Sequence, residues 1–173
     1  GVFLLNNLFL TGRIGIGKST ILKKVLNNID LSIGGYITER IYEGYYRRYI
    51  AKSVKNPNEQ YTIVRSDSRD NSKIWFPEAF EKGLAPLLDK SLKSDDIIVL
   101  DELGSSEKNI DVFTSKIFEL LDSQKIVFGV LKDEDCEFLN NIRNRKDVMI
   151  IRITEGNRDH IWQEIINTLK SFI

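Results

Sequence analysis

The residues with the clearest chemical potential lie near the start of the chain, in the segment TGRIGIGKST at residues 11–20. Gly12 is followed by four residues and then by Gly17, Lys18 and Ser19, which is the spacing of a phosphate-binding loop. Glycines let such a loop turn sharply and direct its backbone N–H groups inward, and the helix that follows adds the positive end of its dipole. The segment therefore predicts a site for phosphate groups.

The side chains of this loop have separate expected roles. Lys18 can reach the β- and γ-phosphates of a bound triphosphate, and the Ser19 hydroxyl can bind Mg²⁺. A glycine-rich turn with a chance Gly-Lys-Ser is the alternative, but the apolar run before the segment and the helical pattern after it favour a phosphate loop. The predicted nucleotide-binding residues of the loop are Gly12, Arg13, Ile14, Gly15, Ile16, Gly17, Lys18, Ser19 and Thr20.

A second motif, IIVLDE at residues 97–102, ends an apolar run with two carboxylates. A parallel strand that ends in Asp101 places this carboxylate where it can hold Mg²⁺ through water, so Mg²⁺ is the predicted cofactor, with Ser19 and Asp101 as its residues. Glu102 can orient the attacking water and accept its proton, and we predict Glu102 and Lys18 as the catalytic residues. Two acids that merely end a strand are the alternative; the loop upstream favours catalysis.

A glutamate directly after the metal-binding aspartate is typical of the RecA-like division of P-loop NTPases. In that division an extra strand lies between the loop strand and the strand that carries the aspartate, and a polar sensor follows it. The segment KIVFGVLKDED at residues 125–135 is the candidate for this strand. Lys132 at its end is then a candidate γ-phosphate sensor, with an ordinary surface lysine as the alternative.

Apolar runs typical of buried strands alternate along the chain with segments of helical periodicity. The predicted strands include residues 8–11, 95–104, 125–131 and 148–153, and the predicted helices span residues 17–29, 78–92, 112–121, 137–145 and 158–172. This alternation favours an α/β fold in which helices cover both faces of a mostly parallel central sheet. With the phosphate loop, it predicts a three-layer P-loop NTPase fold.

One region departs from this alternation. Residues 33–54 are rich in aromatic and β-branched side chains that flank a Glu-Gly pair at residues 43–44, which predicts an antiparallel hairpin after the first helix. Residues 60–66 predict a third strand, and the polar, turn-rich residues 67–73 predict a mobile loop.

Length and composition limit the classes of protein that fit. A chain of 173 residues with 42% hydrophobic and 29% charged residues is typical of one globular domain. We therefore expect a single P-loop NTPase domain over residues 1–173, with the hairpin inserted at about residues 33–65. The formal net charge is zero, which argues against non-specific binding to nucleic acid or to an anionic membrane.

The cysteine content and the opening segment bear on the compartment. The single cysteine, Cys136, excludes an internal disulfide. The opening GVFLLNNLFL has no basic residues and no small-residue cleavage site, which favours a strand with a short leader over a signal peptide. No segment approaches the about 20 apolar residues that span a bilayer. We therefore expect a cytoplasmic protein.

Two further regions carry residues that can contact a nucleotide. The segment TEGNRDH at residues 154–160 follows the last predicted strand, where Asn157 and Arg158 can bind a base or ribose or can simply cap the last helix. The only histidine, His160, is more typical of a capping or surface residue. In the predicted hairpin, one set of residues can stack on a base or form the packed face of a small sheet: Tyr36, Thr38, Tyr42, Tyr45, Tyr46 and Tyr49. The hairpin arginines can stabilise charge in the transition state or face solvent; these are Arg40, Arg47 and Arg48.

Four segments occur in the order and spacing of the nucleoside-triphosphatase family first associated with thermophiles, which includes a human cancer-related NTPase. They are FLTGRIGIGKSTILKKV, GGYITERIYEG, IIVLDELGSSE and ITEGNRD. The chain resembles this family from about Leu8 to the last predicted helix. Its members resemble nucleotide kinases in fold but hydrolyse NTPs.

The resemblance implies a Mg²⁺-dependent hydrolase with a broad NTP preference and slow turnover. It assigns triphosphate binding to the loop, the metal to Asp101 and the base to Glu102, and Glu107 matches a second acidic position of the family. The family usually reads Asp-Glu-Ile-Gly-Lys-Met-Glu where this chain has DELGSSE, so a lysine is missing after Gly104. If that lysine neutralises charge in the transition state, this protein is slower or depends on another cation such as Lys132.

Two other departures lie outside this motif. Tyr42 stands where the family tends to carry an arginine in the first hairpin strand, and a Thr-x-His-like pattern of the family has become Val130-Leu131-Lys132.

Two other functions stay open at this point. A kinase would pass the γ-phosphate to a nucleoside monophosphate or a small hydroxyl compound, with residues 67–73 as part of an acceptor lid. A nucleotide-dependent switch would bind NTP and act through a protein partner, with hydrolysis incidental. The expected ligand in every case is a nucleoside triphosphate, and the sequence identifies neither the base nor a protein partner.

Overall fold

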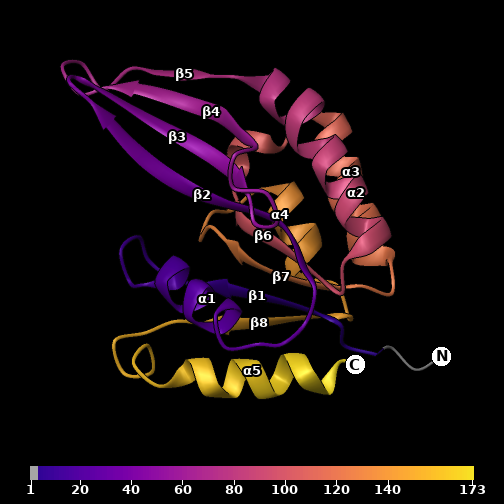
Figure 1. The fold of residues 1–173 in the computed structure, drawn as a ribbon. Helices are drawn as coiled ribbons and strands as arrows, with labels where there is room; N and C mark the ends of the chain where they lie inside the picture. Colours follow the sequence, from indigo (N-terminus) through magenta and orange to yellow (C-terminus); the bar gives the residue numbers. More distant parts are fainter. Residues whose placement is uncertain (1–3) are drawn as a thin grey trace.

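A computed structural model describes residues 4–173 of the chain as one eight-stranded sheet flanked by helices (Figure 1). The strands are β1 (Asn7–Thr11), β2 (Ile33–Glu43), β3 (Tyr46–Ser53), β4 (Gln60–Asp67), β5 (Lys73–Trp75), β6 (Ile97–Leu103), β7 (Ile126–Leu131) and β8 (Val148–Arg152). The helices are α1 (Lys18–Leu26), α2 (Ala85–Ser94), α3 (Asp111–Asp122), α4 (Glu137–Arg143) and α5 (Ile161–Ser171). The first part of the expected leader, residues 1–3, lies outside the described range.

The sheet has a parallel part and an antiparallel part. The strand order is β5-β4-β3-β2-β6-β7-β1-β8; β2, β6, β7, β1 and β8 run parallel, while β3, β4 and β5 pair in antiparallel fashion. The parallel strands β1 and β7 are buried along their whole length. This is the pattern expected of strands covered on both faces, and it explains their uninterrupted apolar sequences.

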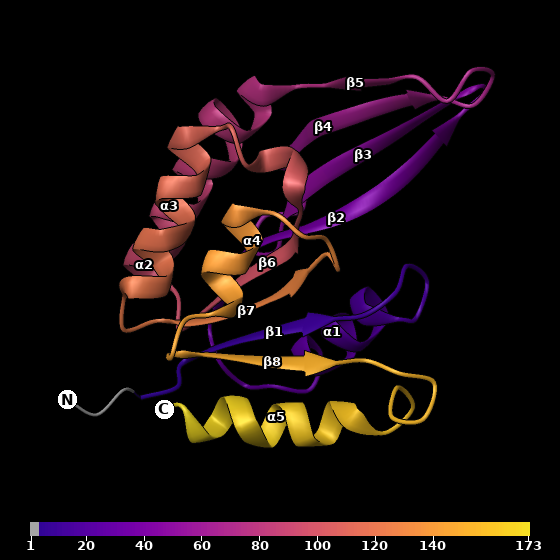
Figure 2. The same cartoon turned by 180° about the vertical axis from the view of Figure 1, so that it is seen from behind.

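Helices cover both faces of the sheet, as predicted. One core lies between the sheet and α2, α3 and α4, with Phe113 and Phe138 among its buried members. The other lies between the sheet and α1 and α5, with Leu22 and Ile165 among its members. Figures 1 and 2 show the resulting three layers from opposite sides. The predicted three-layer α/β fold is therefore confirmed.

Strand β7 lies between β1 and β6, where the sequence places the extra strand of the RecA-like division. Because the three strands are parallel, their carboxyl ends meet at one edge of the sheet. At that edge the phosphate loop follows β1, Lys132 follows β7, and Asp101 and Glu102 lie in the last residues of β6.

The predicted hairpin is present, but the loop expected at residues 67–73 is shorter in the structure and spans residues 68–72. Asp67 is the last residue of β4, and Lys73 begins a fifth strand, β5, that pairs with β4. The Asp67 N–H donates to the Ser72 carbonyl and closes the turn between them. Strand β5 could not be predicted from the sequence because it has only three residues, all exposed, and shows no alternation of apolar and polar side chains.

Two predicted helix boundaries also need correction. The last helix begins at Ile161 rather than near Arg158, because residues 155–160 form turns. The helix predicted at residues 78–92 is continuous, but it opens with a π-helical segment (Ala79–Leu84) before α2. Pro86 is the second residue of α2, directly after the π-helical segment, and has no backbone N–H to donate into that segment.

Gly35 offers a test of the junction between the two parts of the sheet. It has φ 88°, and a Cβ atom there would lie 2.0 Å from the carbonyl oxygen of Val99 on β6. We expect Gly35→Ala to lower the free energy of unfolding by about 3 kcal/mol or more, because the steric overlap adds to the unfavourable φ. Urea unfolding monitored by circular dichroism measures it.

The control for this substitution is Gly44→Ala in the β2–β3 turn. Gly44 also has positive φ, 62°, but a Cβ atom there meets nothing within 4 Å. It isolates the backbone cost of about 1–2 kcal/mol. Equal losses for the two variants would contradict the close approach of β2 to β6.

Candidate functional site

The phosphate loop joins the end of β1 to the start of α1. Gly12, Gly15 and Gly17 all have positive φ, at 144°, 81° and 113°, as the sharp turns of the loop require. A Cβ atom on Gly12 would lie 2.8 Å from the carbonyl oxygen of Ile153, so this glycine also permits close packing on the chain after β8. The Lys18 ammonium reaches back across the loop and donates to the Gly12 carbonyl. The lysine is thus held over the concave side of the loop.

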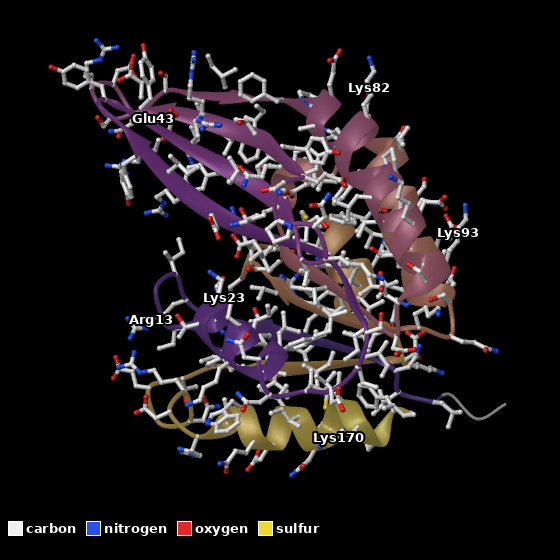
Figure 3. The ribbon with its side chains drawn as sticks, viewed as in Figure 1. Arg13, Lys23, Glu43, Lys82, Lys93 and Lys170 are labelled. Carbon is white, nitrogen blue, oxygen red and sulfur yellow. The ribbon has the colours of Figure 1, made fainter. Side chains whose placement is uncertain are left out.

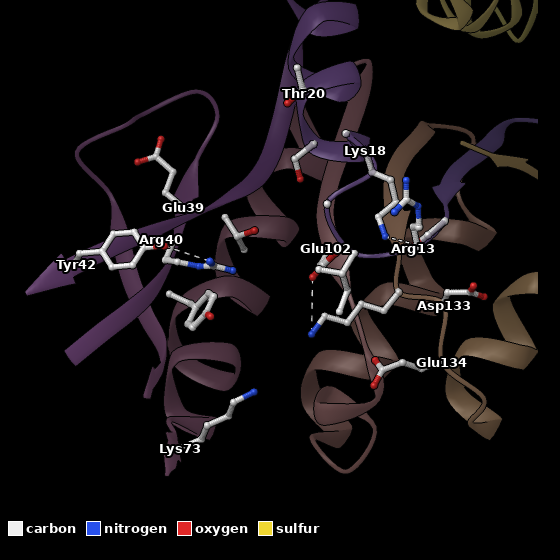
Figure 4. Close-up of a pocket in the computed structure, with 18 residues that line it drawn as sticks. Arg13, Lys18, Thr20, Glu39, Arg40, Tyr42, Lys73, Glu102, Asp133 and Glu134 are labelled. Atoms are coloured by element: carbon white, nitrogen blue, oxygen red, sulfur yellow. Dashed lines mark hydrogen bonds and ion pairs between the residues drawn. The ribbon is translucent and has the colours of Figure 1, made fainter. Parts of the chain in front are cut away.

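A cavity of about 900 Å³ opens above the loop. It is lined by the loop, by strands β2, β3 and β5, by Glu102 at the end of β6 and by residues 132–134 after β7 (Figure 4). Figure 3 shows Arg13 on the phosphate loop and Glu43 near the outer end of the β2–β3 hairpin, so both regions lie on the same side of the molecule. The structure brings these predicted site residues to the cavity: Gly12, Arg13, Ile14, Gly15, Gly17, Lys18, Ser19, Thr20, Glu102 and Lys132.

Asp101 lies beneath the cavity and contacts the loop. Its side chain is fully buried, and the Ser19 hydroxyl donates to its Oδ1 at 3.1 Å. Its Oδ2 has no hydrogen-bond partner among the described residues. Burial, reinforced by the negative charge of Glu102, raises the pKa of Asp101 to about 6. A buried carboxylate oxygen without a partner, beside a serine hydroxyl, is a suitable environment for a cation.

Glu102 lines the cavity, as Figure 4 shows, and Lys132 is another of its lining residues. The Lys132 ammonium lies 3.7 Å from Glu102 Oε1, and both side chains are partly exposed. The backbone carbonyl of Glu102 lies within reach of the buried Tyr36 hydroxyl, which donates to it at 3.4 Å. Two adjacent acids therefore occupy different environments, with Asp101 buried at the loop and Glu102 open to the cavity.

Two residues that the sequence analysis missed hold the loops around this pair. The Glu134 carboxylate accepts from the Ser105 N–H at 3.1 Å and from the Ser105 hydroxyl at 2.9 Å, which joins the loop after β6 to the loop after β7. Arg143 on α4 donates to the carbonyls of Lys132 and Glu134 at 2.8 and 2.7 Å. These contacts join residues 9 to 29 positions apart, so no local motif marks them.

Glu107 has a structural position in the fold. It is buried, and its carboxylate accepts from the Gly104 N–H at 2.9 Å, which closes the turn that follows Glu102. Burial raises the pKa of Glu107 to about 7. The family resemblance identifies this position, and the structure places it outside the lining of the cavity.

The remaining predicted nucleotide-binding residues lie outside the cavity. Ile16 packs into the core and is 2% exposed. The Asn157 side chain holds its own turn, because Oδ1 accepts from the Thr154 N–H at 2.9 Å and Nδ2 donates to the Arg152 carbonyl at 3.0 Å. Arg158 follows in the same turn. This turn is nevertheless linked to the phosphate loop through the ion pair between Arg13 and Glu155.

The hairpin supplies the wall of the cavity opposite the phosphate loop. Arg40 donates to the Tyr42 hydroxyl at 3.2 Å, and its guanidinium lies 5.1 Å from the ring centroid of Tyr49. Lys73 on β5 completes the wall (Figure 4). The other hairpin tyrosines are elsewhere: Tyr36 is buried in the core, and Tyr45 and Tyr46 are exposed at the outer end.

Comparisons with known proteins give a consistent result. Residues 7–166 match the family described as NTPase. The chain is 30% identical to a protein of Thermotoga maritima named nucleoside-triphosphatase THEP1, over 94% of this chain and 95% of that protein. It is 25% identical to a human protein named cancer-related nucleoside-triphosphatase, over 95% of this chain and 97% of that protein. The crystal structure of THEP1 from Aquifex aeolicus is similar in fold, with a TM-score of 0.78 and 21% identity, covering 95% of this chain and 99% of that one.

Within residues 4–173, no helix has both the length and the apolar character needed to cross a membrane.

The buried carboxyl of Glu107 predicts a pH-dependent stability difference. Its pKa is about 7 in the folded protein and near 4.5 when unfolded, so the folded state retains a proton that the unfolded state releases. Wild-type stability therefore decreases as the pH rises between these values. The free energy of unfolding of Glu107→Gln, measured relative to wild type by urea unfolding, should therefore be about 1–3 kcal/mol higher at about pH 8 than at about pH 5.

Glu164→Gln, on the exposed surface of α5, is the control and should show little change over the same range. A difference between Glu107→Gln and wild type that stays constant with pH would show that Glu107 is ionised in the folded protein throughout.

Proposed function

The chain belongs to the NTPase family, and we propose that it hydrolyses nucleoside 5′-triphosphates to the diphosphate and inorganic phosphate with Mg²⁺ and water. The observation that carries this proposal is the hydrogen bond from Ser19 of the phosphate loop to buried Asp101, with Glu102 in the adjoining cavity. The names of the relatives described above support hydrolysis. None of those names indicates a kinase or a switch.

The oxygen atoms at the base of the loop fit a magnesium ion. Ser19 Oγ would bind the ion directly, and Asp101 would hold it through water, which gives its unpartnered Oδ2 a hydrogen-bond partner. Mg²⁺ takes few protein ligands and completes its shell with water and phosphate oxygens. In agreement, the described residues contain no group of three or more His, Cys, Asp or Glu side chains that could hold a metal ion. When bound, the ion would neutralise charge on the β- and γ-phosphates.

The residues of the loop would bind the triphosphate and stabilise the charge that develops on it. Backbone N–H groups between Gly12 and Ser19 would surround the phosphates, and Lys18 would exchange its contact with the Gly12 carbonyl for phosphate oxygens. Glu102 would orient the attacking water and accept its proton. Lys132, 3.7 Å from Glu102, can contact the γ-phosphate from the same side and supply the cation that the missing lysine after Gly104 would provide.

The proposal also includes the domain organisation, the roles of Asn157 and Arg158, the choice of base and the cellular location. The single sheet supports treating residues 1–173 as one domain with an insertion at about 33–65. A base- or ribose-binding role for Asn157 and Arg158 requires their turn to rearrange, because Asn157 is hydrogen bonded within it. A broad choice of base is consistent with contacts that are made chiefly to phosphates. A cytoplasmic location is also part of the proposal, and the single cysteine, which excludes an internal disulfide, is consistent with it.

Product analysis tests the proposed function directly. The protein is incubated with ATP, GTP, CTP or UTP and Mg²⁺, and inorganic phosphate and nucleoside diphosphates are quantified. We expect phosphate from several NTPs and none from Lys18→Ala, because a residue that binds the phosphates is lost. Chelation of Mg²⁺ should also abolish release. Phosphate transfer to an added nucleoside monophosphate without release to water would contradict the proposal.

Glu102→Gln tests the assignment of the base. The substitution keeps the shape of the side chain but cannot accept a proton, so we expect kcat to decrease by about 10²–10⁴-fold. Affinity for a triphosphate, measured by equilibrium binding, should stay near the wild-type value. Unchanged kcat together with weakened binding would show instead that Glu102 has a structural role.

A further inference from the structure

The strands β2–β5 present two chemically different faces. Side chains alternate between the faces of a strand, and the register pairs Arg40 with Tyr49 and Tyr42 with Arg47. Contacts agree with this assignment, since the guanidinium groups of Arg40 and Arg47 lie over the rings of Tyr49 and Tyr42. Lys73 joins the same face through the register of β4 and β5. We call this the cavity-side face: Thr38, Arg40, Tyr42, Arg47, Tyr49, Lys73 and Trp75.

The charges of these strands are sorted by face. Arg40, Arg47 and Lys73 lie on the cavity-side face, and no carboxylate lies on that face among residues 33–75 of the four strands. The acids lie on the opposite face or its edge and form ion pairs there: Glu39 with Lys52, Glu43 with Arg48, and Asp67 with Arg69. Glu39 borders the cavity, but its carboxylate is taken by Lys52.

The carboxylates on the other side of the cavity do not neutralise these cations. Glu102 lies beside Lys132, and Asp133 pairs with Arg152 at 3.1 Å. Glu134 is bound to Ser105. Within the described part of the chain, Arg40, Arg47 and Lys73 have no carboxylate partner. In a chain of zero net charge, this is a local concentration of positive charge that faces the phosphate loop.

The same face offers aromatic surface. Tyr42 is 65% exposed, and Trp75 is 37% exposed at the other side of the face. The Tyr42 ring is held by the hydrogen bond from Arg40 and by the stacked Arg47, so it is positioned before any ligand arrives. Exposed rings between arginines are suited to stacking on a base while the cations bind phosphate.

We propose that the cavity-side face binds a second nucleotide, a nucleoside monophosphate, while the phosphate loop holds the triphosphate. The cavity of about 900 Å³ lies near the upper end of the range of about 300–1,000 Å³ typical of ligand sites. Figure 4 shows Arg40, Tyr42 and Lys73 on the side opposite Lys18. The proposal depends on the proposed function only in assigning the triphosphate to the phosphate loop.

A single nucleotide fits this face better than a nucleic-acid strand. Surfaces that bind single strands follow the backbone over several nucleotides. Here Arg40, Lys73 and the exposed Tyr42 line one cavity, whereas Arg47 and Trp75 lie on the same face beyond its lining. Of the other arginines on these strands and turns, Arg48 and Arg69 are paired with acids and Arg65 lies on the opposite face.

The test uses the full chain with Mg²⁺ and a saturating, non-hydrolysable ATP analogue, so that the phosphate loop is occupied. Titration of the analogue itself tests the phosphate loop, and titration of AMP into the loaded protein by calorimetry tests the cavity-side face. We expect saturable AMP binding that is weakened about tenfold or more by Arg40→Gln, because this variant loses a charge-assisted contact with phosphate. Lys73→Gln should act in the same direction.

Arg65→Gln is the matched control. Arg65 also stacks on a tyrosine, Tyr46, at 4.9 Å, but it lies on the opposite face of the strands and should leave AMP binding unchanged. The proposal is overturned if AMP does not bind the loaded protein, or if Arg65→Gln weakens binding as much as Arg40→Gln. It is also overturned if inorganic phosphate binds as tightly as AMP, or if a single-stranded oligonucleotide binds more tightly.

Discussion

Strands β1, β7 and β6 pair in parallel with Phe9 beside Gly129 and Gly129 beside Leu100, and the functional residues follow directly from this register. A Cβ atom on Gly129 would lie 2.5 Å from the Leu100 carbonyl oxygen and 2.9 Å from the Phe9 ring, so only glycine allows the strands and the ring to pack this closely. The phosphate loop follows β1, Lys132 follows β7, and the two acids lie at the end of β6, so these residues meet where the parallel strands end.

Differences in burial then separate the roles of two neighbouring acids. Asp101 is fully buried under the loop and hydrogen bonded to Ser19, whereas Glu102 faces the cavity with Lys132 beside it. A buried carboxylate is suited to holding a cation, which compensates for its desolvation, and a partly exposed one can exchange protons with water. Arg143 and Glu134 fix the loop that carries Lys132, so long-range contacts position Lys132 beside Glu102.

Features set by local sequence could be predicted, and features set by contacts between distant segments could not. The phosphate loop and the acidic pair follow from spacing, because glycines and strand ends act locally. The position of β7 could be predicted because a glutamate directly after the metal-binding aspartate is typical of the RecA-like division. Strand β5 has three exposed residues and depends on pairing with β4. Ile16 belongs to the phosphate-loop motif, but its side chain packs into the core. Asn157 is held by hydrogen bonds within its own turn. Neither position outside the cavity could be predicted from the motif in which the residue occurs. The roles assigned to the site residues remain predictions.

The hairpin shows how strand alternation can produce a functional surface without a motif. In the sequence its arginines, acids and tyrosines are interspersed, and their total charge does not indicate that one face is cationic. Alternation sends Glu39 and Glu43 to one side, where Lys52 and Arg48 neutralise them, and leaves Arg40 and Arg47 on the other. Because the parallel strand β2 fixes the hairpin beside β6, the unneutralised side faces the phosphate loop. The site therefore has cations on two opposed walls, and a ligand that bridges them must carry negative charge at both ends or come as two phosphorylated molecules.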